Sequence, residues 1–280
     1  MKKLGLIICI VCVAFLFYFK KNNTSIITST TPTRLPPQTI PTTTVKKEYP
    51  KNNNYFVFVP YWSSISNNSP FFPDINNAPP HVGQGIIYFG ITANENGINM
   101  REQGFKNLGL FVQKTITSKF KKILTLRLIN DTVTEKVLQN VNLQKNIIGD
   151  TIAIAKKNGF DEILLDLEVH DLPTEKIIHD ISNFIQKNSA QAHVNNLRFS
   201  VSLYGDVFYR KRPYDVSSIS KVTDMMYLMA YDFHKSHGEP GPNFPLSGKE
   251  VYGYDLKSMV NDFLHLVPSE KLTVVFGMYG

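Results

Sequence analysis

Two acidic residues, Asp166 and Glu168, directly follow the apolar run Ile163–Leu165 in the segment FDEILLDLE. Such a run predicts a short buried strand that ends in acid. Because successive strand side chains point to opposite faces, the two carboxyl groups share a face, with Cα atoms roughly 6.5–7 Å apart. Neighbouring carboxylates repel each other, which keeps a proton available near neutral pH. The pair is therefore either general-acid equipment or two solvated acids at the end of a strand.

The elements that must position this pair alternate between short apolar runs and amphipathic stretches. Strands are expected at Tyr55–Tyr61, Gly85–Ile91, Lys122–Leu128, Ile163–Glu168, Arg198–Leu203, Asp224–Ala230 and Leu272–Phe276. Helices are expected at about Phe105–Lys119, Leu143–Asn158, Thr174–Asn188 and Asp255–Leu266.

This alternation predicts an α/β protein with a parallel sheet and outer helices, of the (β/α)8 TIM-barrel type. Active sites of such barrels lie at the carboxyl ends of the strands, where Asp166 and Glu168 fall. The sequence stops at Gly280, just after the seventh expected strand. We therefore expect residues 51–280 to form a barrel that is incomplete at its C-terminal end.

The net charge of +7 is unevenly distributed along the 280 residues. Residues 1–48 contain seven lysine and arginine residues against the single acid Glu48, so they carry six of the seven charges. The remainder is almost neutral and has no basic stripe that could follow a phosphate backbone. Nucleic acid is therefore not an expected partner.

The N-terminus pairs an apolar run with a polar stretch. An uncharged run from Leu4 to Phe19 lies between lysine pairs, so residues 1–21 are expected to be a membrane anchor rather than a cleaved signal peptide. Residues 22–50 are rich in Thr, Pro and Asn and are expected to be a disordered linker. Both cysteines lie inside the anchor. We expect a domain tethered outside the membrane, facing the cell wall, with secretion as the alternative.

Four stretches resemble the family 18 glycoside hydrolases, the chitinase-like barrels. Residues 161–168 match the DxxDxDxE signature except that Leu164 replaces its middle Asp, and residues 229–234, MAYDFH, match the M-T/A-Y-D element. The loop at 239–246 and the segment at 276–280 resemble the elements that follow. The loop is most similar to that of bacterial cell-wall and spore-associated members, of the N-acetylglucosaminidase type.

The resemblance implies substrate-assisted hydrolysis, in which the 2-acetamido group of the sugar acts as nucleophile. Glu168 would be the general acid and base, and Asp166 would bind the acetamido N–H and balance the positive intermediate. Tyr231 would position the acetamido carbonyl, and Asp232 would bind the sugar. Without the middle Asp, Leu164 should leave Asp166 less restrained and reduce turnover.

Other candidates are less specific. Trp62 follows the first expected strand and could stack on a sugar or pack in the core. Asp161 and Met229 belong to the matched motifs and are candidate substrate contacts, although Met229 could equally fill the barrel. His170 could tune Glu168 or be a solvated loop residue. No cofactor is expected.

His234 and His237 lie near Asp232, but without a further clustered ligand we expect no metal. The sequence therefore predicts a membrane-tethered glycosidase that cleaves β-1,4 links of N-acetylglucosamine-containing polysaccharide, peptidoglycan rather than chitin, with retention of configuration. The alternative is a glycan-binding, lectin-like relative with little or no activity.

Overall fold

The computed structural model describes residues 55–64, 85–234, 238 and 240–277. They belong to one compact unit, Tyr49–Gly280. The expected anchor at 1–21 and linker at 22–50 lie outside the described residues. Within the described ranges, no helix is both long and apolar enough to cross a membrane.

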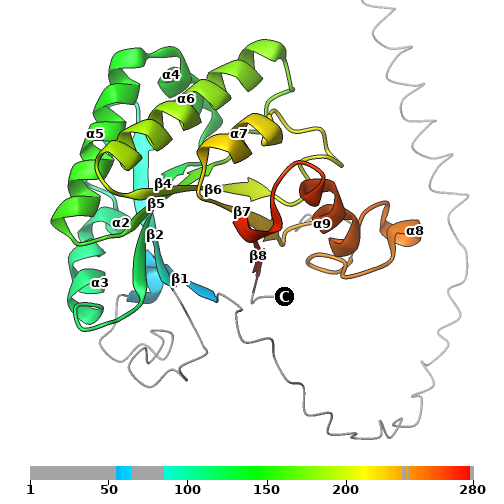
Figure 1. Cartoon of the computed structure of the whole chain (residues 1–280), viewed down its shortest axis with the longest axis horizontal. Helices are drawn as coiled ribbons and strands as arrows, with labels where there is room; N and C mark the ends of the chain where they lie inside the picture. Colours follow the sequence, from blue (N-terminus) through cyan, green and yellow to red (C-terminus); the bar gives the residue numbers. More distant parts are fainter. Residues whose placement is uncertain (1–54, 65–84, 235–237, 239, 278–280) are drawn as a thin grey trace, which may run out of the picture. The chain divides into compact units, whose positions relative to one another are not determined.

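Seven parallel strands form the centre of this unit and follow one another in chain order (Figure 1). They are β1 (Phe56–Pro60), β2 (Gly85–Asn94), β4 (Lys121–Leu128), β5 (Glu162–Leu167), β6 (Arg198–Tyr204), β7 (Met225–Ala230) and β8 (Leu272–Phe276). The two-residue strand β3 (Gly97–Ile98) pairs with β2 in the antiparallel direction. Parallel neighbours in sequence order, joined by helical connections, are the arrangement of a (β/α)8 barrel.

The helices connect these strands and lie outside the sheet (Figure 1). They are α2 (Gln103–Lys106), α3 (Leu108–Lys114), α4 (Asp131–Gln139), α5 (Val141–Lys157), α6 (Glu175–Val194), α7 (Val216–Val222), α8 (Lys249–Tyr252) and α9 (Leu256–Leu264). Two 3-10 turns, η1 (Tyr61–Ser64) and η2 (Ser269–Lys271), complete the described elements. The N-cap residues Asn130, Asn140, Thr174 and Asp215 each accept a hydrogen bond from a first-turn N–H, which explains where four of the helices begin.

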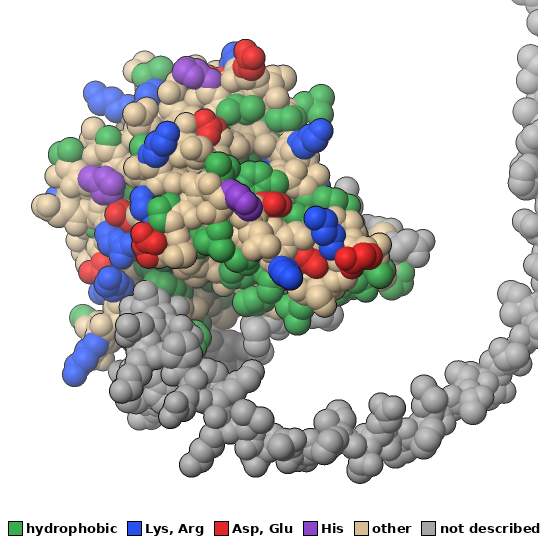
Figure 2. All heavy atoms as spheres, turned by 45° about the vertical axis from the view of Figure 1, so that its right-hand side comes forward, with side chains coloured by type: hydrophobic (Ala, Val, Ile, Leu, Met, Phe, Trp, Pro, Cys, Tyr) green, Lys and Arg blue, Asp and Glu red, His purple; other side chains and the backbone are tan. Residues whose placement is uncertain are grey.

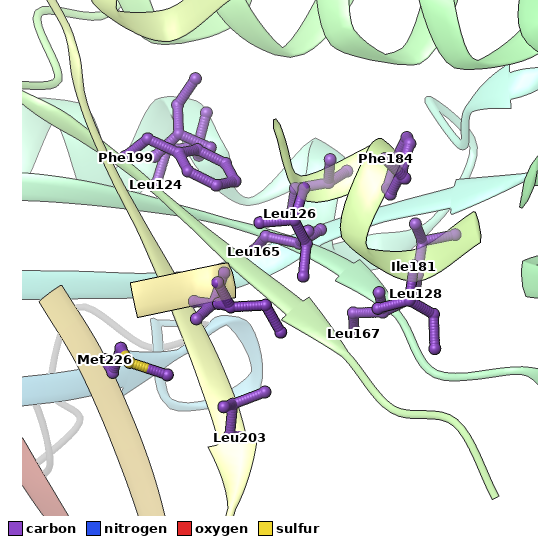
Figure 3. Packing of buried hydrophobic residues seen from close by; sticks show 14 of the residues in the cluster. Leu124, Leu126, Leu128, Leu165, Leu167, Ile181, Phe184, Phe199, Leu203 and Met226 are labelled. Carbon is purple, nitrogen blue, oxygen red and sulfur yellow. The ribbon is translucent and has the colours of Figure 1, made fainter. Parts of the chain in front are cut away.

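Alternation along the strands separates two sets of buried residues. On β5, the side chains of Ile163, Leu165 and Leu167 join the large core between sheet and helices. Figure 3 shows Leu165 and Leu167 packed with leucines of β4 and with residues of α6. Leu164 instead belongs to a smaller cluster inside the sheet with residues of β2, β4 and β7. The residues of β5 that alternate with the outer core, Asp166 among them, therefore line the concave side.

The strand predictions agree with the structure to within three residues at each end. The helix expected at Phe105–Lys119 is instead two helices, α2 and α3, separated at Asn107. The side-chain amide of Asn107 donates to the carbonyl oxygen of Tyr61 at 2.9 Å, which ties this break to the turn after β1. The helices α4 and α7, of nine and seven residues, were not expected.

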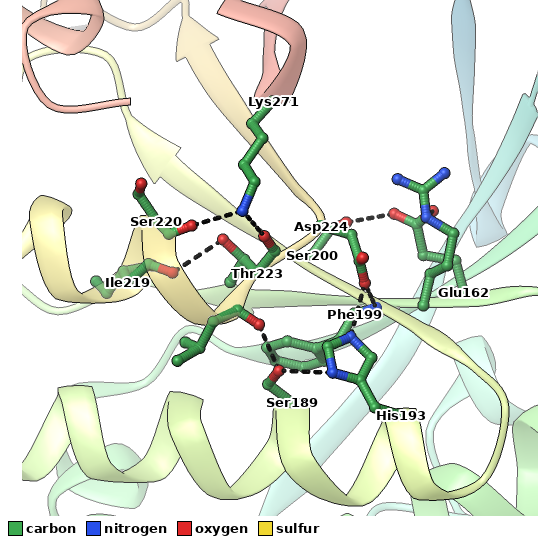
Figure 4. Close-up of polar contacts among 12 residues, drawn as sticks. Glu162, Ser189, His193, Phe199, Ser200, Ile219, Ser220, Thr223, Asp224 and Lys271 are labelled. Atoms are coloured by element: carbon green, nitrogen blue, oxygen red, sulfur yellow. Dashed lines mark hydrogen bonds and ion pairs between the residues drawn. The ribbon is translucent and has the colours of Figure 1, made fainter. Parts of the chain in front are cut away.

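The amino ends of β6 and β7 are held by a network of polar contacts (Figure 4). Asp224 accepts hydrogen bonds from the Phe199 N–H at 2.8 Å and faces Nε2 of His193 at 2.9 Å. The ammonium of Lys271 donates to two carbonyl oxygens at the end of α7, those of Ser220 and Thr223. These contacts hold α6, α7 and η2 at the end of the sheet opposite to Asp166 and Glu168.

The surface carries both signs of charge. On the face in Figure 2, lysine and arginine side chains lie interspersed with aspartate and glutamate. The basic side chains on that face form no continuous stripe.

Candidate active site

The site is built at the carboxyl end of β5, where Asp166 is the fifth residue of the strand and Glu168 follows its last residue. The backbone N–H of Glu168 donates to the carbonyl oxygen of Leu128 on β4 at 2.9 Å. Asp166 is 3% exposed, and Glu168 is half-buried. The strand thus presents one enclosed and one accessible carboxyl group.

A tyrosine clamps the backbone on both sides of Glu168. The hydroxyl of Tyr214 donates to the carbonyl oxygen of Leu167 at 2.7 Å and accepts from the N–H of Val169 at 3.0 Å. Burial raises the pKa of Tyr214 above its ordinary value, so the hydroxyl keeps its hydrogen. Since the residues before and after Glu168 are held by one side chain, the backbone of Glu168 has little freedom.

Asp166 is held by the neighbouring strand. The hydroxyl of Ser202 on β6 donates to its Oδ1 at 2.5 Å, and the two residues are register partners. Burial, and then the charge of Glu168, raise the pKa of Asp166 to about 7, while Ser202 and Arg127 act in the opposite direction. Its Oδ2 is buried and has no hydrogen-bond partner among the residues that the structure describes. An acceptor of this kind can receive a donor from a ligand.

Arg127 lies opposite Asp166 on the other neighbouring strand, β4, as its register partner. Its guanidinium lies 4.6 Å from the ring centroid of Phe89 and 5.8 Å from that of Tyr61, and Nη1 donates to the hydroxyl of Thr92 at 3.3 Å. The side chain is 8% exposed. A buried positive charge beside Asp166 partly offsets the cost of ionising that carboxyl group.

Glu168 is held by Tyr204 at the end of β6. The Tyr204 hydroxyl lies 2.8 Å from Oε2 of Glu168 and 3.0 Å from Nε2 of His170. The guanidinium of Arg212 lies over the Tyr204 ring at 3.6 Å from its centroid, and Asp206 accepts from Nε of Arg212 at 2.5 Å. The ring is therefore fixed by stacking, and its hydroxyl is directed at the carboxyl group.

Tyr231 and Asp232 follow directly after β7, at the same end of the sheet. Asp232 has a φ of +55°, a left-handed conformation that aspartate tolerates better than most residues. Asn243 holds this turn, because its Oδ1 accepts from the Asp232 N–H at 2.7 Å and its backbone oxygen accepts from the Phe233 N–H at 2.8 Å. Tyr231 is half-buried and Asp232 is exposed.

Trp62 lies in η1, directly after β1, and 53% of its surface is exposed. Its ring contacts Tyr61 and Phe89 edge-on, at centroid distances of 5.0 and 6.1 Å. Core packing, the alternative for this residue, does not describe an indole that is more than half exposed. An exposed ring at the carboxyl end of a barrel strand is positioned for stacking on a ligand.

Asp161 does not join the other candidates, which corrects the expectation of a substrate contact. It precedes β5 at the amino end, opposite to Glu168, and its Oδ2 accepts from the backbone N–H of Lys122 at 2.8 Å. The carboxylate ties β5 to the start of β4. Asp161 therefore acts on the fold.

Met229 and Leu164 are both buried on the strands that carry the site. Met229 is the fifth residue of β7 and is 6% exposed, two residues before Tyr231. Leu164 is fully enclosed in the apolar cluster inside the sheet. In the described part of the chain, no group of three or more His, Cys, Asp or Glu side chains could hold a metal ion, and His237 lies outside that part.

Sequence reasoning missed Ser202 and Tyr204, the two residues of β6 that bind the acids. A signal was present, because Ser200, Ser202 and Tyr204 alternate with the apolar residues of their strand. In a strand buried on both faces, polar side chains at every second position indicate a polar interior.

A surface groove of about 540 Å³ lies elsewhere, between α6 and α7. Its lining includes Glu175, His179 and Lys221, and none of the site residues. The groove lies on the helices outside the sheet, so it is separate from Asp166 and Glu168.

The chain matches the model of the glycosyl hydrolases family 18 over residues 58–280. It is 22% identical over 149 residues to a putative sporulation-specific glycosylase of Bacillus subtilis, covering 53% of this chain and 34% of that protein. It is 30% identical over 139 residues to an uncharacterized glycosylase of Bacillus subtilis, covering 44% of this chain and 40% of that one. The chain thus spans well under half the length of these two curated relatives.

Solved structures share the fold. A Group IV chitinase of Ostrinia furnacalis in complex with allosamidin has a TM-score of 0.66 at 19% identity, covering 79% of this chain and 65% of the chitinase. The spore cortex-lytic enzyme SleL of Bacillus megaterium has a TM-score of 0.61 at 16% identity, covering 80% and 50%. The match to the family model over most of the sequence confirms the expected resemblance, and the chain belongs to family 18 of the glycosyl hydrolases.

Proposed function

We propose that this protein hydrolyses β-1,4 links next to N-acetylated amino sugars, with retention of configuration, by substrate-assisted catalysis. The observation that carries the proposal is the pair of acids at the end of β5. Asp166 is enclosed and Glu168 is accessible, and each is held by a separate hydroxyl of β6. Acid catalysis in which the substrate supplies the nucleophile requires a restrained, accessible carboxyl group as general acid and a second carboxyl group beside it.

In the first step, Glu168 donates its proton to the glycosidic oxygen. The acetamido oxygen of the same sugar attacks C1 from the opposite face, the C1–O bond breaks, and the leaving sugar departs as an alcohol. The sugar left behind is a positively charged oxazolinium. Because the nucleophile belongs to the substrate, the protein has to supply only one strong acid.

Asp166 balances the charge that develops in this step. Its Oδ2, which no described residue of the chain bonds, accepts the acetamido N–H. With its pKa raised to about 7, Asp166 holds a proton in part of the free protein near neutral pH. The amide hydrogen bond favours the ionised form of Asp166 and leaves the proton on Glu168.

In the second step, Glu168 accepts a proton from water. The water oxygen attacks C1 on the face that the leaving group left, and the oxazolinium opens to restore the acetamido group. Two inversions at C1 give net retention. Glu168 ends the cycle protonated, as it began.

Three further residues orient the sugar. Tyr231 directs its hydroxyl at the acetamido carbonyl, and the exposed Asp232 binds sugar hydroxyls from the turn held by Asn243. Trp62 offers its exposed ring for stacking. Orientation matters because the internal attack gains its rate advantage only from a near-attack geometry.

Peptidoglycan is the proposed substrate, with chitin as the alternative. The apolar run at 4–19 and the Thr/Pro-rich stretch that follows favour a tethered domain outside the membrane, within reach of a wall. Two relatives named for sporulation and spore cortex lysis support the same choice. Washing the membrane fraction with alkaline carbonate tests the tether. The full chain should stay in the membrane fraction, and the Val13→Arg variant should be released.

Turnover of a chromogenic N-acetylglucosaminide oligomer tests the activity. Glu168→Gln should lower kcat by roughly 10²–10⁴-fold, the usual contribution of a general acid. Glu175→Gln is the matched control, because Glu175 is an exposed acid on α6, outside the sheet. Equal rates for the parent and Glu168→Gln would contradict the proposal.

A glycan-binding protein without activity is the second candidate. The observation in its favour is Leu164, which replaces a motif acid. A human pseudo-chitinase with retained chitooligosaccharide binding has the same fold, with a TM-score of 0.63. Intact oligosaccharide binding, with equally low turnover in the parent and Glu168→Gln, would favour this candidate.

A further inference from the structure

A row of hydrogen-bonded side chains leads from Glu168 to the surface. The Tyr204 hydroxyl lies 2.8 Å from Oε2 of Glu168 and 3.0 Å from Nε2 of His170. Nδ1 of His170 lies 3.3 Å from Oδ1 of Asp131, the first residue of α4. The same Oδ1 accepts from the backbone N–H of His170 at 3.2 Å. Asp131 therefore binds both the ring and the backbone of His170.

Exposure increases along this row. Glu168 and Tyr204 are half-buried, whereas 54% of the His170 side chain and 45% of the Asp131 side chain are exposed. The outer end can exchange protons with solvent, and the inner end touches the proposed acid. The row thus joins a titratable surface group to the site through one hydroxyl.

Hydrogen counting limits the row to two fully bonded arrangements. The Asp131 carboxylate only accepts, so Nδ1 of His170 carries a hydrogen. If His170 is neutral, its Nε2 accepts from the Tyr204 hydroxyl, whose oxygen accepts from protonated Glu168. If His170 is charged, its Nε2–H donates to Tyr204, which donates to ionised Glu168. The two arrangements contain equal numbers of protons. They differ in whether Glu168 or His170 holds the titratable proton and in the direction of the Tyr204 hydroxyl.

The Tyr204 hydroxyl keeps its hydrogen in both arrangements. Burial, followed by the charge of Glu168, raises the pKa of Tyr204 above its ordinary value, and Arg212 above the ring acts in the opposite direction. The stacked Arg212 is itself held by Asp206. Tyr204 can therefore reverse the direction of its hydroxyl without losing its place.

We propose that His170, oriented by Asp131, sets the direction of the Tyr204 hydroxyl and so decides at which pH the proton leaves Glu168. The inference deepens the proposed function and rests on it for its catalytic meaning. Tyr204 and His170 are positioning residues in this account, because they act through Glu168. A neutral His170 turns the hydroxyl hydrogen away from Glu168, which keeps the acid protonated.

The other charged groups near the row are accounted for by separate contacts. Asp166 faces Glu168 from the same strand and is bonded to Ser202. Tyr214 bonds the backbone beside Glu168. Arg127 on β4 acts on Asp166. None of these groups changes in the variants below, so changes in pH dependence can be assigned to the row itself.

The pH dependence of kcat in the full chain tests the inference. In His170→Ala, Glu168 is the remaining acceptor in the row for the Tyr204 hydroxyl, which then stabilises the ionised acid. The alkaline limb of the curve of kcat against pH should therefore move to lower pH, by about one unit. In Tyr204→Phe, the ionised acid loses its donor, so the limb should move up and the maximal kcat should fall. In the double variant, His170→Ala should add nothing to Tyr204→Phe.

Matched controls separate these effects from changes in stability. Tyr209→Phe and His179→Ala alter an exposed tyrosine and an exposed histidine outside the row, and should leave the limb in place. A His170→Ala profile equal to that of the parent would overturn the inference. So would a His170→Ala shift that persists in the Tyr204→Phe background.

A second measurement is independent of turnover. The ring nitrogen shifts of His170, followed by NMR against pH, should contain a step that comes from Glu168 and disappears in both Glu168→Gln and Tyr204→Phe. Identical His170 titrations in all three proteins would overturn the coupling. If the step is present and the parent shows no turnover, the coupling stands and the proposed hydrolase function fails.

Discussion

The hydroxyl of Ser202 donates to Oδ1 of Asp166 at 2.5 Å from the register position beside it on β6. This contact restrains Asp166, which was expected to be loose because Leu164 replaces the middle acid of the motif. Unlike the middle acid of the motif, which Leu164 replaces, the Ser202 hydroxyl cannot take up a shared proton. Ser202 therefore lowers the pKa of Asp166 without adding a second acid beside it.

Ser202→Ala should change the pH dependence of kcat/KM. The parent should lose activity above about pH 7, as the pair releases its proton. The Ser202 hydrogen bond lowers the pKa of Asp166, so its removal should raise that pKa and move the alkaline limb upward, by about half a unit to one unit. Ser200→Ala is the control, since Ser200 bonds Glu162 on the same strand face. A downward shift in Ser202→Ala would contradict the assignment.

Leu164→Asp should both lower the free energy of unfolding and change the pH dependence of kcat/KM. Leu164 is fully buried among Ile87, Ile123 and Tyr227, so a polar group there should cost roughly 1–3 kcal/mol of unfolding free energy. The new carboxyl can share the proton of Asp166 and should move the alkaline limb upward. Leu164→Asn should cost similar stability without that shift. Identical profiles for the parent and Leu164→Asp would count against an influence of this position.

Trp62→Ala should weaken substrate binding and leave the fold intact. The loss of a stacking surface should raise KM by about tenfold, equivalent to about 1.4 kcal/mol. The melting temperature should hardly change, because the ring is more than half exposed. Steady-state kinetics on short and long oligomers, with a melting curve of each protein, make the comparison. A large loss of stability with unchanged KM would assign Trp62 to the fold.

Much of this arrangement follows from the sequence. Alternation identified the strands and put Asp166 and Glu168 on one face, because β5 is buried on both sides and its period is unambiguous. The partners of the two acids could not be read in the same way. Ser202 and Tyr204 are 36 residues away from the acids they bind, and their contact depends on the register between β5 and β6.

The misses have local causes. The helices α4 and α7 are short, and their start is set by the side-chain caps of Asn130 and Asp215 more than by apolar periodicity. Asp161 belongs to a motif whose outer acid lies at the opposite end of the strand from its catalytic end. The expected strand at Ile163–Glu168 already puts Asp161 before its amino end, so this position follows from the spacing along the strand.

The free energy of unfolding should decrease as the pH is lowered, because Asp224, at the amino ends of the strands, becomes protonated. Burial raises its pKa, but the bonds from Phe199 N–H and His193 outweigh burial, so the pKa is lowered overall. A lowered pKa stabilises the fold above the ordinary aspartate value of about 4, and this contribution is lost as pH falls through the folded value. Asp224→Asn should reduce stability at pH 7 and flatten its dependence between about pH 5 and 2. Urea unfolding at several pH values measures both, and parallel curves for the two proteins would exclude the assignment.

The most direct test of the account concerns the nucleophile. Two chromogenic oligomers that differ only in an N-acetyl or N-trifluoroacetyl group on the cleaved sugar should be compared by kcat/KM. Fluorine withdraws electrons from the amide oxygen, so if that oxygen attacks C1 with Glu168 as acid, the trifluoroacetyl substrate should react at least about tenfold more slowly. Equal rates for the two substrates would contradict substrate-assisted catalysis.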